Sequence, residues 1–253
     1  MDFASLNLCQ PLLDALDEIG YVTPTPIQAQ AIPDLIVGRD MVGCAQTGTG
    51  KTAAFALPIL DAMAEDPQVG LRHIHALILC PTRELASQIN DNIEQYARHL
   101  DIRSMVMFGG VSQRPQVNKL RRGVDILVAT PGRLLDLISQ GYVDLSHVQF
   151  LVLDEADRML DMGFIPDIEF ICSKLPETRQ TMLFSATMPP PIEKLTKKFL
   201  NNPKRIEVSR AATTNKDITA FKIPVKSRQK RETLRWLLNH DQVETAIVFA
   251  NRK

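Results

Sequence analysis

The chain of 253 residues is 45% hydrophobic, which provides enough apolar material for one α/β domain and a further segment. Lys and Arg total 29, as do Asp and Glu, so the composition excludes a uniformly basic nucleic-acid-coating protein. Any nucleic-acid site must therefore be local. No apolar run approaches about 18 residues and the chain opens with the acidic Asp2, so we expect no membrane span, no signal peptide and a cytoplasmic location.

The cysteines give no sign of a metal centre. Cys9, Cys44, Cys80 and Cys172 form no C-x-x-C pair and no histidine cluster accompanies them, so we expect no zinc site. Three of them lie beside or within apolar runs, which is typical of buried, reduced thiols in the cytoplasm.

Short apolar runs rich in β-branched residues recur along the chain and are mostly continuous rather than alternating. Continuous runs are typical of strands that are buried on both faces. Helical patterns lie before and between them, so we predict an α/β fold with a mostly parallel sheet covered by helices on both faces. The predicted helices span 11–19, 26–37, 83–100, 114–123, 193–200 and 227–238, and the predicted strands span 40–45, 75–80, 103–108, 125–130, 150–155 and 181–186.

The amino-acid composition changes near residue 209. Residues 209–218 are small and polar, which is typical of a linker. A strand–helix–strand pattern follows over 219–253, and a unit of roughly 40 residues cannot bury a core of its own. We therefore predict one complete domain over 1–208, a linker, and the incomplete start of a second domain.

The first predicted strand ends in AQTGTGKT, residues 45–52, which predicts a phosphate-binding loop. Backbone N–H groups of Gly48 to Lys51 at a helix start can face an anion, because the helix dipole favours negative charge there. The Lys51 ammonium would reach the β- and γ-phosphates, and the Thr52 hydroxyl would bind Mg²⁺. An ordinary glycine-rich turn is the alternative interpretation.

The stretch LVLDEAD, residues 151–157, places two carboxylates at the end of another predicted strand. Asp154 can hold hydrated Mg²⁺, and Glu155 can orient or deprotonate an attacking water. A solvated acidic helix start is the alternative, since the helix dipole also favours that arrangement. In parallel sheets, ligands bind beyond the carboxyl ends of strands, where we expect both motifs to lie.

Together with these two stretches, further motifs give the chain a family resemblance. GYVTPTPIQ (20–28), PTREL (81–85), ATPGR (129–133) and SAT (185–187) occur in order with AQTGTGKT and DEAD (154–157). The chain resembles the DEAD-box ATP-dependent RNA helicases from residue 3 to the end. Within that family, its overall sequence most resembles the bacterial RhlE-type group. The resemblance implies a RecA-like P-loop NTPase domain, 1–208, that carries the Q motif of that family, followed by the start of a second RecA-like domain.

The resemblance assigns a nucleotide site with ATP and Mg²⁺ as cofactors. Lys51, Asp154 and Glu155 would be catalytic, with Asp154 and Thr52 holding the metal. Gln28 would read adenine through its carboxamide, and Tyr21 could stack on the base, although an exposed helix residue and a core aromatic are the plainer interpretations. The residues implied to bind the nucleotide are Tyr21, Gln28, Gln46, Thr47, Gly48, Thr49, Gly50, Lys51 and Thr52.

The resemblance also assigns an RNA site and a coupling site. RNA would be bound through its backbone without sequence preference, although surface arginines and a plain glycine turn explain the same residues. Ser185 and Thr187 would link the nucleotide to the RNA, with the Asp157 carboxylate as a plausible acceptor, or they cap a turn. The residues implied to contact RNA are Thr82, Arg83, Gly109, Gly110, Thr130, Gly132 and Arg133.

The implied activity is ATP-dependent local unwinding of RNA duplexes. Motifs of the second domain, including that with the arginine fingers, do not occur in these 253 residues, so we expect the chain to be nearly inactive alone. An ATP-gated RNA clamp without unwinding and a DNA-translocating helicase are the alternatives. The chain carries no N-K-x-D guanine motif, which favours ATP over GTP.

Overall fold

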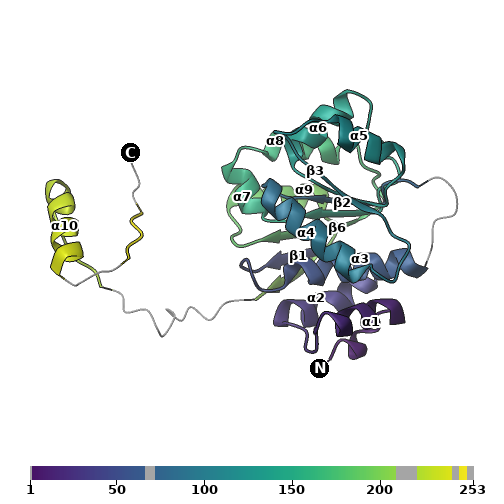
Figure 1. The fold of residues 1–253 in the computed structure, drawn as a ribbon, viewed down its shortest axis with the longest axis horizontal. Coiled ribbons are helices and arrows are strands. Elements are labelled where there is room, and N and C mark those ends of the chain that lie inside the picture. The colour runs from purple at the N-terminus through teal and green to yellow at the C-terminus, as the bar shows by residue number, and fades with distance from the viewer. Residues whose placement is uncertain (1, 66–71, 209–220, 241–244, 250–253) are drawn as a thin grey trace. The chain divides into compact units, whose positions relative to one another are not determined.

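The computed structural model describes residues 2–65, 72–208, 221–240 and 245–249. The chain divides into two units, Met1–Arg210 and Ala211–Lys253, which are described separately below (Figure 1). The predicted linker at 209–218 lies outside the described residues, and the assignment of the domains stays a prediction.

The first unit is built on a seven-stranded sheet in which every pairing is parallel, as the continuous apolar runs predicted. Its strand order is β3-β4-β2-β5-β6-β1-β7, so β1 lies beside β6 rather than beside β2. The strands are β1 (Met41–Cys44), β2 (Ala76–Leu79), β3 (Ser104–Met107), β4 (Ile126–Ala129), β5 (Phe150–Leu153), β6 (Gln180–Ser185) and β7 (Lys204–Glu207).

Helices cover both faces of this sheet and bury two separate apolar cores (Figure 1). One core takes Leu12, Ile27, Phe55 and Ile89 from α1 to α4, and the other takes residues from α5 to α9. The helices are α1 (Gln10–Glu18), α2 (Pro26–Ile36), α3 (Lys51–Glu65), α4 (Arg83–Tyr96), α5 (Arg114–Arg121), α6 (Pro131–Ser139), α7 (Ala156–Asp161), α8 (Ile165–Cys172) and α9 (Pro190–Phe199), with a short 3-10 helix at Ala4–Leu6.

The six predicted strands are present, and the structure adds β7, which the sequence analysis missed. β7 is an edge strand that pairs only with β1, and Ile206 alone among its four residues is buried. A continuous apolar run is the mark of a strand buried on both faces, so a half-exposed edge strand does not carry it. The predicted helix at 83–100 ends earlier, at Tyr96.

The second unit contains the short 3-10 helix Ser227–Gln229 and α10 (Lys230–His240) over its described residues. The helix prediction is confirmed, but the flanking strands are wrong where the structure describes them, since 221–226 and 245–249 form no strand. A strand needs a hydrogen-bonded neighbour, and this pattern of one strand, one helix and one strand offers no wider sheet to join. None of the described helices is long and apolar enough to cross a membrane.

Candidate nucleotide and nucleic-acid site

The order of the strands sorts the predicted motifs into two groups along one edge of the sheet. The loops after β1, β6 and β5, which are consecutive neighbours, carry AQTGTGKT, SAT and DEAD. The loops after β2, β4 and β3 carry PTREL, ATPGR and the Gly109–Gly110 pair. Because all strands are parallel, their carboxyl ends meet at one edge, with the nucleotide motifs on one half and the RNA motifs on the other.

The phosphate loop closes directly onto a helix. α3 begins at Lys51, and Gly48 and Gly50 just before it have φ of +82° and +89°, which side chains with a Cβ rarely adopt. A Cβ on Gly50 would also stand 2.5 Å from Nε2 of Gln28. Glycine is therefore needed at position 50 both for backbone conformation and for space.

Lys51 and Asp154 meet beneath this loop. Nζ of Lys51 lies 3.7 Å from Oδ1 of Asp154 and donates to the Ala45 carbonyl oxygen at 3.1 Å. Both residues are buried, at 6% and 2% exposure. Burial raises the pKa of Asp154 to about 6, although the Lys51 charge acts in the opposite direction. The Lys51 ammonium and the Asp154 carboxylate are thus held together in a buried position. There an incoming anion could bind the ammonium and an incoming cation could bind the carboxylate, in place of the contact between them.

Glu155 has a strained backbone at the end of β5. Its φ of 51° and ψ of 50° lie in the left-handed region, which a non-glycine residue occupies at a cost of about 1–3 kcal/mol. Its Oε1 accepts a hydrogen bond from Thr47 Oγ1 at 3.0 Å, and its Oε2 accepts one from Arg158 Nη1 at 3.3 Å. This backbone conformation directs the Glu155 carboxylate toward Thr47 of the phosphate-binding loop.

A cavity of about 350 Å³ lies between these groups. Of the residues predicted to bind the nucleotide, Tyr21, Thr47, Gly48, Gly50, Lys51 and Thr52 line it together with Asp154 and Glu155. Gln46 and Thr49 lie in the same loop but do not line the cavity, and Thr49 Oγ1 donates to the Gln46 carbonyl oxygen at 2.7 Å. A carboxylate and a hydroxyl on one cavity wall are the donors that Mg²⁺ prefers, so the residues present fit ATP and Mg²⁺.

Gln28 lies behind the cavity rather than in its wall. It is 3% exposed, its Oε1 accepts from the Thr25 backbone N–H at 2.8 Å, and its Nε2 donates to the Gly50 carbonyl oxygen at 3.1 Å. The carboxamide therefore joins the Q-motif segment to the phosphate loop in this structure. Adenine recognition by Gln28 stays a prediction and requires these bonds to be exchanged.

The residues predicted to couple the two sites form one connected set. Asp157 Oδ2 accepts from both the backbone N–H and the hydroxyl of Thr187, each at 2.9 Å. Ser185 does not donate to Asp157 as expected, because its hydroxyl donates to the Thr187 carbonyl oxygen at 2.7 Å and accepts from the Asp157 N–H at 3.1 Å. Thr187 thus occupies Oδ2 of Asp157, while Oδ1 accepts from the Arg158 N–H at 3.1 Å. Ser185 joins the loop after β5 to the loop after β6.

A second cleft, of about 400 Å³, opens on the other half of the edge. Thr82, Arg83, Gly109, Gly110 and Thr130 line it, as the predicted RNA site requires. Arg83 Nη1 donates to the Gly109 carbonyl oxygen at 3.3 Å.

Gly132 and Arg133 lie just outside the lining of this cleft. Arg133 Nη2 donates to the Val111 carbonyl oxygen at 3.1 Å. Arg83 and Arg133 thus both contact the segment from Gly109 to Val111, which fixes its path.

The sequence analysis missed residues at both clefts. Met162 and Phe164, which follow α7, line the second cleft and add an apolar side. Gln88, Asn92 and Tyr96 line the first, and their spacing of four residues along α4 places them on one helix face. That spacing after PTREL is a signal from which the α4 residues could have been found.

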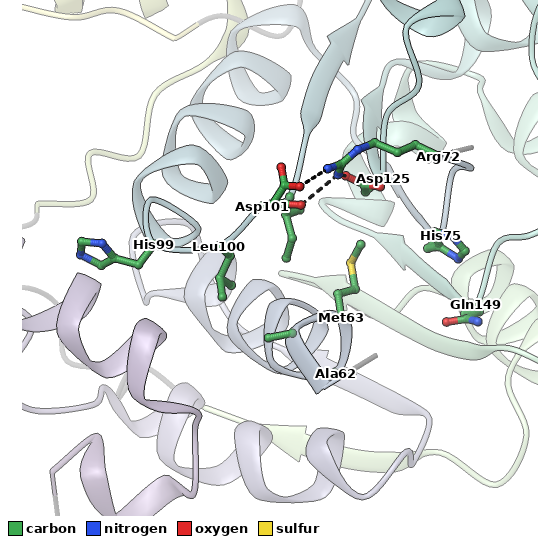
Figure 2. A pocket seen from close by; sticks show the side chains of 11 residues that line it. Ala62, Met63, Arg72, His75, His99, Leu100, Asp101, Asp125 and Gln149 are labelled. Carbon is green, nitrogen blue, oxygen red and sulfur yellow. Dashed lines mark hydrogen bonds and ion pairs between the residues drawn. The ribbon is translucent and has the colours of Figure 1, made fainter. Parts of the chain in front are cut away.

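Another cavity, of about 190 Å³, lies away from the motifs (Figure 2). Arg72 crosses it and pairs with Asp101 at 2.5 Å and with Asp125. None of the predicted site residues lines this cavity. One guanidinium thus bridges two carboxylates, which indicates a structural role.

Comparisons with known proteins agree with the arrangement of the motifs. The sequence profile of the DEAD/DEAH box helicase family matches residues 25–195. The chain is 44% identical to "ATP-dependent RNA helicase DeaD" of Escherichia coli (strain K12) over 252 residues, which cover 99% of the chain and 39% of that protein. It is 42% identical to "DEAD-box ATP-dependent RNA helicase CshA" of Streptococcus pneumoniae, covering 100% of the chain and 48% of that protein. The chain therefore spans two fifths to one half of the length of these relatives.

Solved structures give the same result for the fold. A DEAD box protein from Methanococcus jannaschii matches with a TM-score of 0.77 and 37% identity, over 96% of this chain and 64% of that one. A hypothetical ATP-dependent RNA helicase from Sulfolobus tokodaii matches with a TM-score of 0.73 and 40% identity, over 79% and 57% of the two chains. The placement in the RhlE-type group stays a prediction. The chain belongs to the DEAD/DEAH box helicase family.

Proposed function

We propose that this chain is the ATP-binding half of an ATP-dependent RNA helicase that unwinds short RNA duplexes locally. The observation that carries the proposal is the pairing of Lys51 with buried Asp154 at 3.7 Å, beneath a glycine loop at a helix start. A second cleft with two arginines lies on the same sheet edge. The relatives named above are described as RNA helicases, which supports RNA as the second ligand.

In this proposal the loop N–H groups and Lys51 hold the phosphates of ATP, while Thr52 and Asp154 hold Mg²⁺. When bound, the ion neutralises charge on the phosphates. Glu155 would orient the attacking water and take its proton through the lone pairs that its hydrogen bonds from Thr47 and Arg158 leave free. Tyr21, 38% exposed in the cavity wall, is available to stack on the base.

RNA would bind in the second cleft through its sugar-phosphate backbone. Arg83, Arg133 and Thr82 supply hydrogen-bond donors. The space beside the main chain at Gly109 and Gly132 is open, with no atom within 4 Å of the position that a Cβ would take, so an RNA strand can approach closely. Contacts to phosphates carry no base information, so binding is independent of sequence and weakens strongly with salt. Asp157, Ser185 and Thr187 join the loop after β5 to the loop after β6, and β5 lies next to β2 of the RNA half, so they would transmit the nucleotide state toward the RNA side.

The second RecA-like domain implied by the family would complete the enzyme. It would close over ATP and RNA and supply the arginine fingers, which accelerate phosphoryl transfer by about 10³–10⁵-fold. This chain alone would therefore bind nucleotide weakly, hydrolyse it negligibly and unwind nothing.

The test compares this chain with a version extended through a complete second domain, in ATPase and strand-displacement assays with RNA. We expect RNA-stimulated turnover and unwinding only from the extended version. Equal turnover by both would contradict the division of labour between two domains. ATP-dependent RNA retention without strand displacement would identify a clamp instead, and stimulation by DNA equal to that by RNA would identify a DNA translocase.

A further inference from the structure

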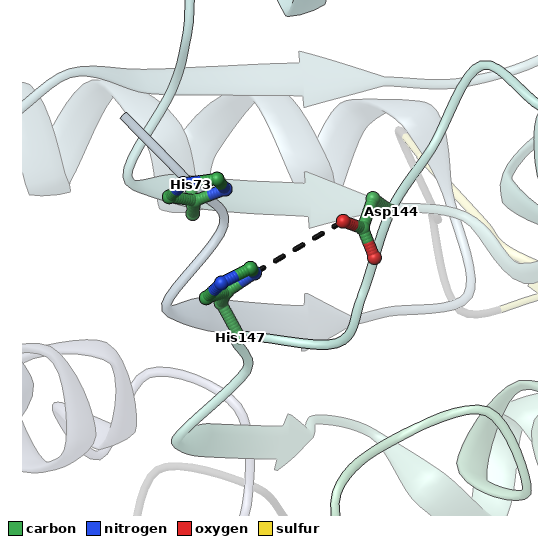
Figure 3. Close-up of side chains that lie close together, drawn as sticks. All are labelled: His73, Asp144 and His147. Carbon is green, nitrogen blue, oxygen red and sulfur yellow. Dashed lines mark ion pairs between the residues drawn. The ribbon is translucent and has the colours of Figure 1, made fainter. Parts of the chain in front are cut away.

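Three side chains with metal-binding atoms gather at the opposite edge of the sheet from the nucleotide. His73 precedes β2, and Asp144 and His147 precede β5, so all three lie near the amino ends of strands. One ligand atom from each residue lies within 4.8 Å of the others (Figure 3). We expected no zinc site, because the four cysteines form no C-x-x-C pair and no histidine cluster accompanies them in the sequence. His73 lies about 70 positions before Asp144 and His147, so the sequence does not show that the three side chains meet.

The register of the sheet explains why the two imidazoles meet. Ala76 of β2 is paired with Phe150 of β5, and each histidine stands three residues before its member of that pair. Adjacent strands are about 4.8 Å apart, and the two rings accordingly stack with centroids 3.8 Å apart and planes 21° from parallel. The position of the pair is therefore set by the core of the fold rather than by a loose loop.

Backbone hydrogen bonds fix both approaching segments. The His75 carbonyl oxygen accepts from the N–H groups of Gln149 and Phe150 at 2.8 and 3.0 Å. On the other side, the Ser146 N–H donates to Asp144 Oδ1 at 2.9 Å, which orients the carboxylate. The other carboxylate oxygen of Asp144, Oδ2, lies 4.0 Å from Nδ1 of His147, the contact drawn in Figure 3.

The donor set selects one class of ligand. Two imidazole nitrogens and one carboxylate oxygen suit Zn²⁺ and neighbouring divalent transition metals, whereas Mg²⁺ and Ca²⁺ prefer oxygen alone. The Asp144 and His147 side chains are 69% and 47% exposed, so an ion can enter from solvent and water can fill a fourth position.

Binding needs only a small local change. Zinc–nitrogen bonds of about 2.0–2.1 Å place ligand atoms about 3.4 Å apart, so the three must close in slightly from their present separation. Stacked rings cannot both point a nitrogen at one ion, so each must turn about its side-chain bonds. Asp144 and His147 are exposed and His73 is half-buried, so the side chains on the Asp144–His147 segment have the most freedom to turn.

We propose that His73, His147 and Asp144 form a surface site for a divalent transition-metal ion, with Zn²⁺ as its representative. The ion would join the segment before β2 to the segment before β5. Those two strands carry PTREL and DEAD at their other ends. The site shares no residue with the proposed nucleotide and RNA clefts, so it stands or falls independently of them.

The test titrates Zn²⁺ into the full chain and follows binding by calorimetry and imidazole resonances by NMR. We expect one equivalent to bind, with the signals of His73 and His147 moving together while those of His99, which pairs with Glu18, stay in place. His73→Ala, His147→Ala and Asp144→Asn should each weaken binding by about tenfold or more. The matched control His99→Ala should bind as the unmodified chain does.

Two results would overturn the proposal. One is equal Zn²⁺ affinity in the unmodified chain and in the His73→Ala/His147→Ala double variant, with both folded by circular dichroism. The other is a thiolate-to-metal charge-transfer band when Co²⁺ replaces Zn²⁺, since it would place the ion on a cysteine. His147→Gln, which keeps a polar side chain of similar size, provides a second variant should the alanine form fold poorly.

Discussion

Asp154 is the residue at which burial and charge oppose each other most directly. Burial disfavours its charged form and the nearby Lys51 ammonium compensates only in part, so the pKa of Asp154 rises to about 6 from its ordinary 3.8. A site that binds a cation gains from such a carboxylate, because the incoming ion relieves an unfavourable buried charge. Both residues were singled out from the sequence and their roles stay predictions. The contact between Lys51, at the start of α3, and Asp154, just after β5, arises from the fold, which no local pattern shows.

The raised pKa of Asp154 predicts how stability changes with pH. The folded state keeps its proton up to about pH 6 and the unfolded state loses it near 3.8, so this group's contribution to stability is present below pH 3.8 and is lost as pH rises through 6. The Asp154→Asn variant has no titrating carboxyl group at this position, so its stability does not fall with pH for this reason. The free energy of unfolding of the variant relative to the unmodified chain should rise between pH 4 and 7 by up to about 3 kcal/mol, measured by urea denaturation. A difference that is constant with pH would contradict the assignment.

Arg133 provides a residue-scale test of the RNA cleft. Arg133→Ala should weaken binding of single-stranded RNA equally for all sequences and reduce the slope of log affinity against log salt by about 1. Arg98→Ala is the control, since it removes the same charge from a surface pair with Glu18. If the two variants had the same effect on the salt slope, Arg133 would contribute only general charge.

At the scale of elements, the β-strands were predicted well and their order was not. Continuous burial along β2 and β4 leaves a clear apolar signature, whereas β7, with three of four residues exposed, leaves none. The neighbour relations β6-β1 and β2-β5 arise from crossovers through helices, and no residue pattern encodes them. The grouping of the predicted nucleotide motifs and the predicted RNA motifs on two halves of the sheet edge depends on that order, as do the stacked histidines.

Gly43 in β1 tests the packing that holds this order. A Cβ there would stand 2.5 Å from a ring carbon of Phe184, a fully buried residue of the adjacent strand β6. Gly43→Ala should therefore lower the free energy of unfolding by about 1–3 kcal/mol. Gly132→Ala is the matched control because a Cβ there meets nothing within 4 Å. Equal midpoints of urea denaturation for the two variants would show that β6 can move aside.

At the scale of the whole molecule, the two units differ in what they bury. The residues of both apolar cores lie within Met1–Arg210, whereas Phe221, Trp236 and Phe249 of the second unit are exposed. The strands predicted around α10 are lacking in its described residues because a sheet needs partner strands that this segment alone does not offer.

A version ending at Arg210 should consequently keep the fold and the nucleotide site. We expect its midpoint of thermal unfolding to match that of the 253-residue chain and its ADP affinity to be unchanged, since every cavity-lining residue precedes that position. Calorimetry of both versions provides the measurement. A loss of nucleotide affinity on removing residues 211–253 would show that the second unit contributes to the site.

Lys51 and the glycine loop would form an anion pocket that faces Asp154. Isothermal titration of Mg²⁺-ADP and Mg²⁺-ATP into the unmodified chain, Lys51→Ala and the control Lys119→Ala, whose lysine is exposed on α5, tests it most directly. We expect that Lys51→Ala loses measurable binding while it stays folded, and that Lys119→Ala binds as the unmodified chain does. Unchanged affinity in a folded Lys51→Ala protein would contradict it.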